Sequence, residues 1–334
     1  NSDEEGVAKL QKFNVKLLEG TDKGEVVEID LPIYKDDEYN INAKVGDRVV
    51  VYKTFDNYGS DEMQLQYYIS DVDKRIELYI MGIGFIILVL LIARRNGLKA
   101  LFALIVTIAF IIKIFIPAIY NGYSPILFAT MTAVFSSLIT IYFTVGVNKK
   151  FVIALLGVTG GVLIAGTFSY IFTYRMHLNG FLDSDLLASA YLLKNIKIKE
   201  LIPAGVIIGS LGAVMDLAVS ITSSINELHE IDPNISKKSM FKSAINIGND
   251  IIGTMINTLI LAYIASSIFT LLLIYIQANE YPLIRILNFQ DIAVEIMRSI
   301  CGSIGILIAV PLNLFINAAD ILKIKTGFII RLRI

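Results

Sequence analysis

After Arg75 the chain consists of long apolar stretches separated by short polar ones. Seven of these stretches cover approximately residues 77–93, 100–119, 124–146, 151–173, 202–226, 247–276 and 292–318. About 20 apolar residues in a helix cross a hydrocarbon layer of about 30 Å, and a helix pairs its own backbone polar groups there. The pattern therefore predicts an α-helical polytopic membrane domain over residues 76–320, with about seven visible transmembrane helices.

Residues 1–75 have a different pattern, in which short β-branched and aromatic runs are separated by polar turns. Strands are predicted near residues 26–31, 45–52 and 63–69, whereas residues 7–13 fit either a helix or an extended segment. We predict a small β-rich domain here, similar to a barrel or a sandwich.

Composition supports this division into two parts. Hydrophobic residues make up 55% of the 334 residues and charged residues 18%, and the mean hydropathy is +0.67. A soluble protein of this length has no means of burying so much apolar surface, because single cores stop growing near 250–300 residues. The net charge is −7 over residues 1–75 (10 bases, 17 acids) and +6 over residues 76–334 (19 bases, 13 acids). There is no basic stripe for nucleic acid, and the single Cys301 excludes an internal disulfide.

Basic residues between the spans predict the orientation. If residues 1–75 lie outside, the internal loops and tail hold 12 Lys and Arg residues and the external segments hold five. We therefore expect a plasma-membrane protein with an extracytoplasmic N-terminal domain and a basic cytoplasmic tail over residues 321–334. Export of that domain requires a signal sequence or one more helix upstream. Residues 183–196 fit a short amphipathic helix in the outer interface.

Ionisable side chains inside the spans are the candidate functional residues, because each is costly in lipid and faces a cavity or a partner. Asp216 lies near the middle of its span, with Ser220 and Ser224 four and eight residues further on. Gly205, Gly209 and Gly212 precede it as a small-residue face that allows close helix packing. Asp216 is interpreted either as a proton or cation site or as a protonated carboxyl held by interhelical hydrogen bonds.

The following span carries Asp250, Thr254, Asn257 and Thr258 on one helical face. Carboxylate, amide and hydroxyl oxygens are suitable ligands for protons, Na⁺ or polar substrates. The alternative for Asp250 is a carboxylate at the N-terminal end of a helix, where it complements the helix dipole.

Three more intramembrane charges complete the set of candidates. Glu295 and Arg298 are three residues apart on the last span, and we expect them to form an ion pair with either a structural or a pathway role. Lys113 either extends to the outer surface or neutralises an acid. No catalytic constellation, metal cluster, phosphate loop or cofactor motif is present, so the sequence predicts neither an enzyme nor a cofactor.

Several of these stretches resemble the YibE/F family of bacterial multi-span membrane proteins. The strongest similarity lies in Ile208–Ile221 with Asn226–Leu228, and in Ile247–Tyr263. Supporting stretches are Gly122–Pro125, Gly146–Lys149, Glu295–Arg298 and Gly302–Gly305. The resemblance covers about residues 20–318 and implies a permease-like protein whose substrate is not settled. A weaker likeness, through Gly212, Asp216 and Glu227, is to membrane halves of resistance–nodulation–division and Sec accessory proteins.

Two functions remain open. The first is a secondary transporter of a small polar or peptide substrate, coupled to a proton or cation through Asp216. The second is a non-transporting receptor or assembly and docking partner, similar to a Sec accessory protein. The lipid bilayer is the expected environment, and the small-residue face of Gly157 and Gly161 allows a homodimer.

Overall fold

The computed structural model describes residues 7–34, 40–56, 64–146, 149–180, 195–232, 235–277 and 282–325. The chain divides into two compact units, Asn1–Leu91 and Ile92–Ile334. The amphipathic helix predicted at residues 183–196 falls almost wholly outside the described residues.

The N-terminal unit contains four strands in two antiparallel hairpins. Strands β1 (Val7–Lys16) and β2 (Val26–Tyr34) form one sheet, and β3 (Val49–Asp56) and β4 (Gln64–Val72) form the other. Residues 7–13, for which helix and extension were both open, thus belong to a strand. The two sheets share a small buried cluster of Ile29, Leu31, Ala43 and Ile69. Burial of these side chains stabilises hairpins that would be marginal alone.

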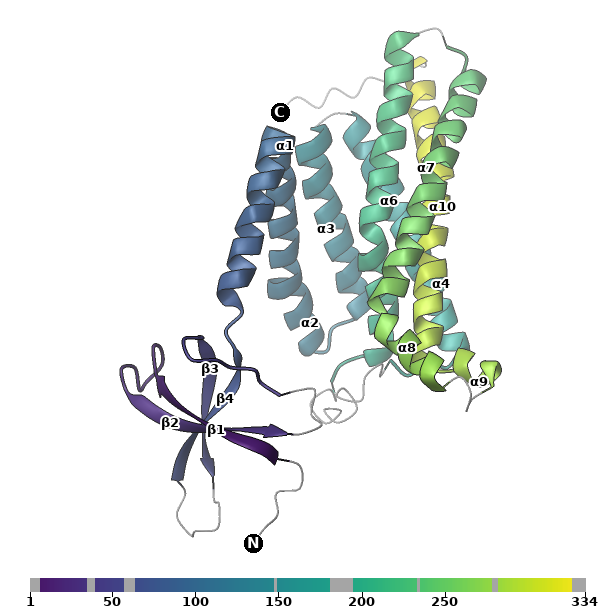
Figure 1. The fold of residues 1–334 in the computed structure, drawn as a ribbon. Coiled ribbons are helices and arrows are strands. Elements are labelled where there is room, and N and C mark those ends of the chain that lie inside the picture. Colours follow the sequence, from purple (N-terminus) through teal and green to yellow (C-terminus); the bar gives the residue numbers. More distant parts are fainter. Residues whose placement is uncertain are drawn as a thin grey trace. The chain divides into compact units, whose positions relative to one another are not determined.

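The rest of the described chain is helical (Figure 1). The helical elements are α1 (Arg75–Phe110), η1 (Ile111–Phe115), α2 (Ile116–Tyr120), α3 (Pro125–Val145), α4 (Lys149–Arg175), α6 (Ile198–Ile231), α7 (Lys237–Ser266), α8 (Ile268–Gln277), α9 (Leu283–Leu287) and α10 (Gln290–Lys325). Within the described residues, six helical segments are long and apolar enough to cross a membrane. These segments and the small β region confirm the prediction of a polytopic membrane protein.

The first of the six segments, Arg75–Tyr120, is too long for one crossing. Its 46 residues would extend about 69 Å at the rise of an α-helix, more than twice the hydrocarbon thickness. Its backbone is not helical at Arg94, where φ is 48° and ψ is −125°. The break separates two helical parts of 19 and 26 residues, each of spanning length. The break lies in the polar interval between the first two predicted spans, 77–93 and 100–119. Both spans therefore fall within this one helical segment, and seven predicted spans correspond to six segments.

One predicted span has different limits in the structure. The stretch predicted at 247–276 begins ten residues earlier, at Lys237, and its helix ends at Ser266. Ser236 caps this helix by accepting a hydrogen bond from the backbone of Ser239. Helix α8 follows after an interruption at Ser267. Residues 237–246, in which three lysines alternate with core residues such as Met240 and Ala244, thus continue the helix instead of forming a loop.

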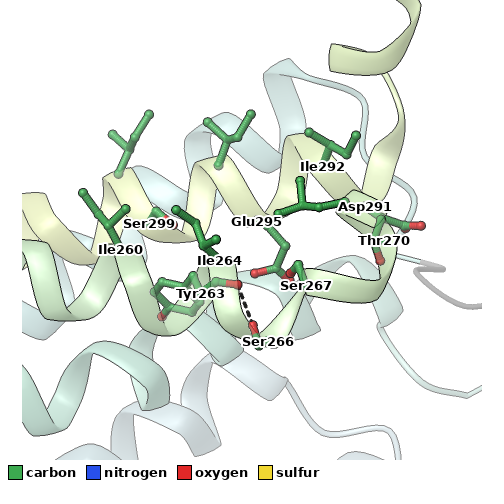
Figure 2. A pocket seen from close by; sticks show the side chains of 13 residues that line it. Ile260, Tyr263, Ile264, Ser266, Ser267, Thr270, Asp291, Ile292, Glu295 and Ser299 are labelled. Atoms are coloured by element: carbon green, nitrogen blue, oxygen red, sulfur yellow. Dashed lines mark hydrogen bonds between the residues drawn. The ribbon is translucent and has the colours of Figure 1, made fainter. Parts of the chain in front are cut away.

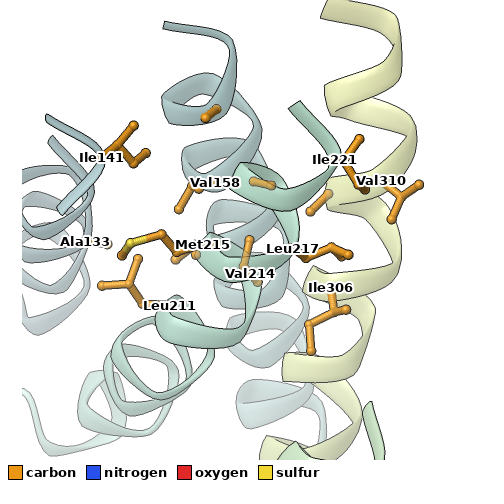
Figure 3. Close-up of a cluster of buried hydrophobic side chains, with 14 of the residues drawn as sticks. Ala133, Ile141, Val158, Leu211, Val214, Met215, Leu217, Ile221, Ile306 and Val310 are labelled. Carbon is orange, nitrogen blue, oxygen red and sulfur yellow. The ribbon is translucent and has the colours of Figure 1, made fainter. Parts of the chain in front are cut away.

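Helices α4, α6 and α10 pack against one another (Figure 1), α3 packs against α4 and α6, and α7 packs against α6 and α10. Figure 3 shows the buried cluster that joins them, in which Val214, Leu217 and Ile221 of α6 meet Val158 of α4 and Ile306 of α10. All five side chains are almost fully buried. Because lipid tails are as apolar as these side chains, close packing and not hydrophobic transfer holds the helices together.

The small-residue face of Gly157 and Gly161 is occupied within the chain. A Cβ atom placed at Gly161 would lie 2.9 Å from the carbonyl oxygen of Gly305, and one at Gly157 would collide with the Asn313 side chain. Both glycines therefore allow α4 to approach α10. The sequence allows a homodimer through this face, but in the structure α10 of the same chain occupies it.

Candidate functional site

A cavity of about 460 Å³ lies between the end of α7, the start of α8 and the first turns of α10 (Figure 2). This volume is in the range of small-molecule sites in proteins. Its apolar lining consists of Ile260, Ile264, Leu271, Ile292, Ile296 and Ile300. Its polar lining consists of Tyr263, Ser266, Ser267, Thr270, Asp291, Glu295 and Ser299. The cavity thus combines an apolar wall with two carboxyl groups and several hydroxyl groups.

The predicted ion pair is present at this cavity. Arg298 donates through Nη1 to Oε1 of Glu295 at 2.6 Å, and both side chains are about three-quarters buried. The second carboxylate oxygen, Oε2 of Glu295, and Nε of Arg298 are buried and have no hydrogen-bond partner. Buried polar atoms without partners are rare in folded proteins and often mark sites that complete their bonding with a ligand or water. Glu295 is therefore the strongest candidate binding residue in the described chain.

Helix α6 forms the other side of this cluster through two glycines. A Cβ atom at Gly209 would lie 2.6 Å from the hydroxyl oxygen of Tyr263, and one at Gly205 would lie 3.8 Å from the Arg298 guanidinium. The Tyr263 hydroxyl is buried and has no hydrogen-bond partner. Sequence reasoning identified the glycine spacing but missed Tyr263, because a tyrosine in an apolar run carries no signal of its contact with a glycine on another helix.

Asp216 occupies a different part of the molecule. It is the nineteenth of the 34 residues of α6, and its side chain is exposed. The opposite side of the helix is filled by buried Val214 and Leu217, so the polar stripe lies away from the core. Ser220 and Ser224 are half-buried beside it. Asp216 therefore does not line the cavity between α7, α8 and α10, and its role as a proton or cation site stays a prediction.

The polar residues of α7 are also exposed. Asp250, Thr254, Asn257 and Thr258 lie on one face as predicted, and all four side chains are accessible. The hydroxyl groups of Thr254 and Thr258 donate to backbone carbonyls of their own helix, which leaves their oxygens as acceptors. Asp250 is the fourteenth residue of α7, so it is not a carboxylate at a helix N-terminus. The helix dipole acts within the first turn and does not explain its position.

Lys113 lies in η1 with an exposed side chain. Among the residues that the structure describes, no acid forms an ion pair with it. The structure thus brings Glu295 and Arg298 together at the cavity and leaves Asp216, Asp250 and Lys113 on the helix surfaces.

Among proteins of curated function and among solved structures, no similar protein was found. The family model described as YibE/F-like protein matches residues 81–322, which are 242 of the 334 residues. The match begins after β4, so the four strands lie outside it, although the resemblance was expected from about residue 20. It includes the cavity, the polar stripes and the ion pair. The chain therefore belongs to the YibE/F-like family of proteins.

Proposed function

We propose that this protein is a permease of the plasma membrane, which moves a small polar or peptide substrate by secondary transport. The observation that carries the proposal is the cavity between α7, α8 and α10, because Glu295, which lines it, forms an ion pair with Arg298 among apolar helices. Charged groups inside membrane helices normally serve a ligand or ion pathway because a purely structural alternative made of apolar residues costs less. Transport, and not catalysis, is the activity that this arrangement favours.

Coupling to a proton or cation is assigned to Asp216. Placing an ionised carboxylate in hydrocarbon costs roughly several kcal/mol of free energy. A helix movement that transfers the exposed Asp216 side chain between water and lipid therefore requires the binding of a proton or cation. Substrate movement and ion movement become linked if the same rearrangement opens the cavity. In the expected orientation, β1–β4 lie outside the cell and the C-terminus inside.

The test is transport by the purified protein in liposomes loaded with a pH-sensitive dye. A panel of amino acids, short peptides and amines is added outside, and substrate-dependent proton movement is recorded. We expect Asp216→Asn to abolish coupled flux while the protein still elutes as a folded species. Glu227→Gln, which changes an exposed acid on the same helix, is the matched control and should leave flux unchanged. Equal flux in the wild type and in Asp216→Asn would refute the coupling.

A second function, a non-transporting docking partner, is favoured by one observation. The polar faces that contain Asp216 on α6 and Asp250 on α7 are both exposed, and a partner in the membrane would cover them. The β region of strands β1–β4 would then bind another protein outside the cell. Deletion of residues 1–72 separates the two functions. A transporter retains flux without the strands, whereas a docking protein loses its activity.

A further inference from the structure

Three buried polar atoms at the cavity have no hydrogen-bond partner in the structure. They are the Tyr263 hydroxyl, Nε of Arg298 and Oε2 of Glu295. Tyr263 and Glu295 belong to the lining of the cavity (Figure 2), and Arg298 is the ion-pair partner of Glu295. Among the residues that the structure describes, the Ser169 hydroxyl is the one other buried side-chain atom left in this state. Three of the four orphaned atoms therefore gather at one place.

The missing partners are two acceptors and one donor. A guanidinium Nε–H only donates, a hydroxyl hydrogen also donates, and an ionised carboxylate oxygen only accepts. The nearby Ser266 hydroxyl already donates to the backbone carbonyl of Tyr263, as the dashed line in Figure 2 shows. A group that completes the bonding here therefore needs an acceptor for Tyr263 and Arg298 and a donor for Glu295.

The charge at this place favours a neutral group. Nη1 of Arg298 and Oε1 of Glu295 lie 2.6 Å apart, so the two charges compensate each other. Asp291, the other acid of the lining, also has an interaction partner in the structure. An added cation or anion would thus stand as an uncompensated charge beside side chains that are about three-quarters buried. Burial of such a charge costs much more than burial of a neutral group that makes hydrogen bonds.

The apolar lining favours an organic ligand over water alone. The cavity has a volume of about 460 Å³, and six of its 13 lining residues are Ile or Leu. A water molecule satisfies polar atoms but gains nothing from aliphatic walls. The walls instead suit the carbon skeleton of a ligand whose polar end reaches the three orphaned atoms.

We propose that this cavity binds a neutral carboxamide that carries at least one N–H. Its carbonyl oxygen accepts from Tyr263 and Arg298, and its N–H donates to Oε2 of Glu295. Its alkyl part lies against Ile292 and Ile296. The three polar atoms are covered in this conformation, so side chains of the cavity wall rotate when the ligand enters. The proposal names the substrate class of the transporter and rests on the proposed function for its physiological use, although binding itself requires no transport.

A saturation-transfer NMR titration of the full-length protein in phosphatidylcholine nanodiscs tests the proposal. The probe is butyramide at pH 7, compared with N,N-dimethylbutyramide, which has no N–H, and with anionic butyrate and cationic butylammonium. We expect saturable binding of butyramide and at least about tenfold weaker binding of the other three, since a hydrogen bond to a charged group is lost or a charge is left uncompensated. N,N-dimethylbutyramide is the more lipophilic amide, so mere partition into lipid would favour it. Equal or tighter binding of any of the three would overturn the proposal.

Two variants locate the site independently. Tyr263→Phe removes only a hydroxyl that has no partner in the empty cavity, and it should weaken butyramide binding about two- to tenfold. Ile296→Trp fills the cavity without changing its charge and should abolish binding. Tyr275→Phe, which changes an exposed tyrosine outside the lining, is the matched control and should bind as the wild type does. Unchanged affinity in either cavity variant would refute the site, and each serves alone if the other does not fold.

N-methylbutyramide distinguishes the two sources of the amide group. It has one N–H, as a peptide bond has. Binding as tight as that of butyramide assigns the cavity to peptides, and clearly weaker binding assigns it to primary amides. Both results support a carboxamide site. Butyramide binding without any flux in liposomes refutes transport and leaves the site intact, whereas flux of another substrate class without butyramide binding refutes the site and leaves transport intact.

Discussion

The ion pair between Glu295 and Arg298 can be tested through the stability of the bundle. Replacement of Arg298 by Leu removes one partner and leaves the buried carboxylate of Glu295 without compensation, and Glu295→Leu does the same to the guanidinium. Loss of one partner from a fully buried pair costs about 3–5 kcal/mol. The side chains are 24% and 22% exposed, so water or headgroups screen part of this penalty. We expect each single variant to lower the free energy of unfolding by ~2–4 kcal/mol.

The double variant decides whether the loss arises from the pair. With Leu at both Glu295 and Arg298, no charge remains buried, and apolar replacement of a buried pair is often neutral or stabilising. We expect the double variant to lie within ~1 kcal/mol of the wild type, which gives a coupling energy of at least ~2 kcal/mol. The assay is equilibrium unfolding in mixed micelles with increasing dodecyl sulfate, followed by circular dichroism. If the two single losses simply add in the double variant, the pair contributes no interaction and the reasoning fails.

Two further predictions concern packing and pH. Gly161→Ala places a methyl group 2.9 Å from a backbone carbonyl and should destabilise the bundle by about 1–3 kcal/mol, whereas Gly212→Ala meets no atom within 4 Å and should be neutral or stabilising in the same unfolding assay. In the N-terminal unit, the Lys53 ammonium that donates to Asp22 at 2.9 Å holds the pKa of that carboxyl below its usual range. The stability that the ionised Asp22 carboxyl contributes is present above about pH 4 and is lost as the pH falls through its lower folded-state pKa. Asp22→Asn should therefore flatten the acid side of a profile of thermal stability against pH between about pH 2 and 5. If the variant loses stability in acid as steeply as the wild type does, the prediction fails.

The membrane fold could be predicted because hydrocarbon imposes strict length and composition limits on a helix. The break at Arg94 falls in a polar interval that separates two apolar stretches, and the pairing of Glu295 with Arg298 follows from their spacing on one helix. Both features depend on local sequence alone. The early start of α7 was missed because residues 237–246 mix three lysines with apolar residues and therefore lie outside the continuous apolar stretch.

The side of a helix that faces its neighbours was harder to predict. On α6, small or apolar residues occur all around the helix, so periodicity does not separate the buried side of Leu217 from the exposed side of Asp216. Gly157 and Gly161 permit close packing against any partner, and only the tertiary structure shows that α10 is that partner. The cavity required an interruption at Ser267, which lies between two apolar segments and therefore carries no turn signal.

Helix α6 provides a physical connection between the cavity cluster and the candidate coupling residue. Gly209, which contacts the Tyr263 hydroxyl, and Asp216 are seven residues apart, so they lie on nearly the same side of the helix and about 10 Å apart along its axis. A glycine at this contact leaves room for the Tyr263 hydroxyl, so α6 and α7 approach closely there. Any sliding of α6 that exposes or covers Asp216 also shifts Gly209 against Tyr263 and Gly205 against Arg298. Coupling between ion and ligand under the proposed function therefore needs no long chain of side-chain contacts, because one rigid helix carries both.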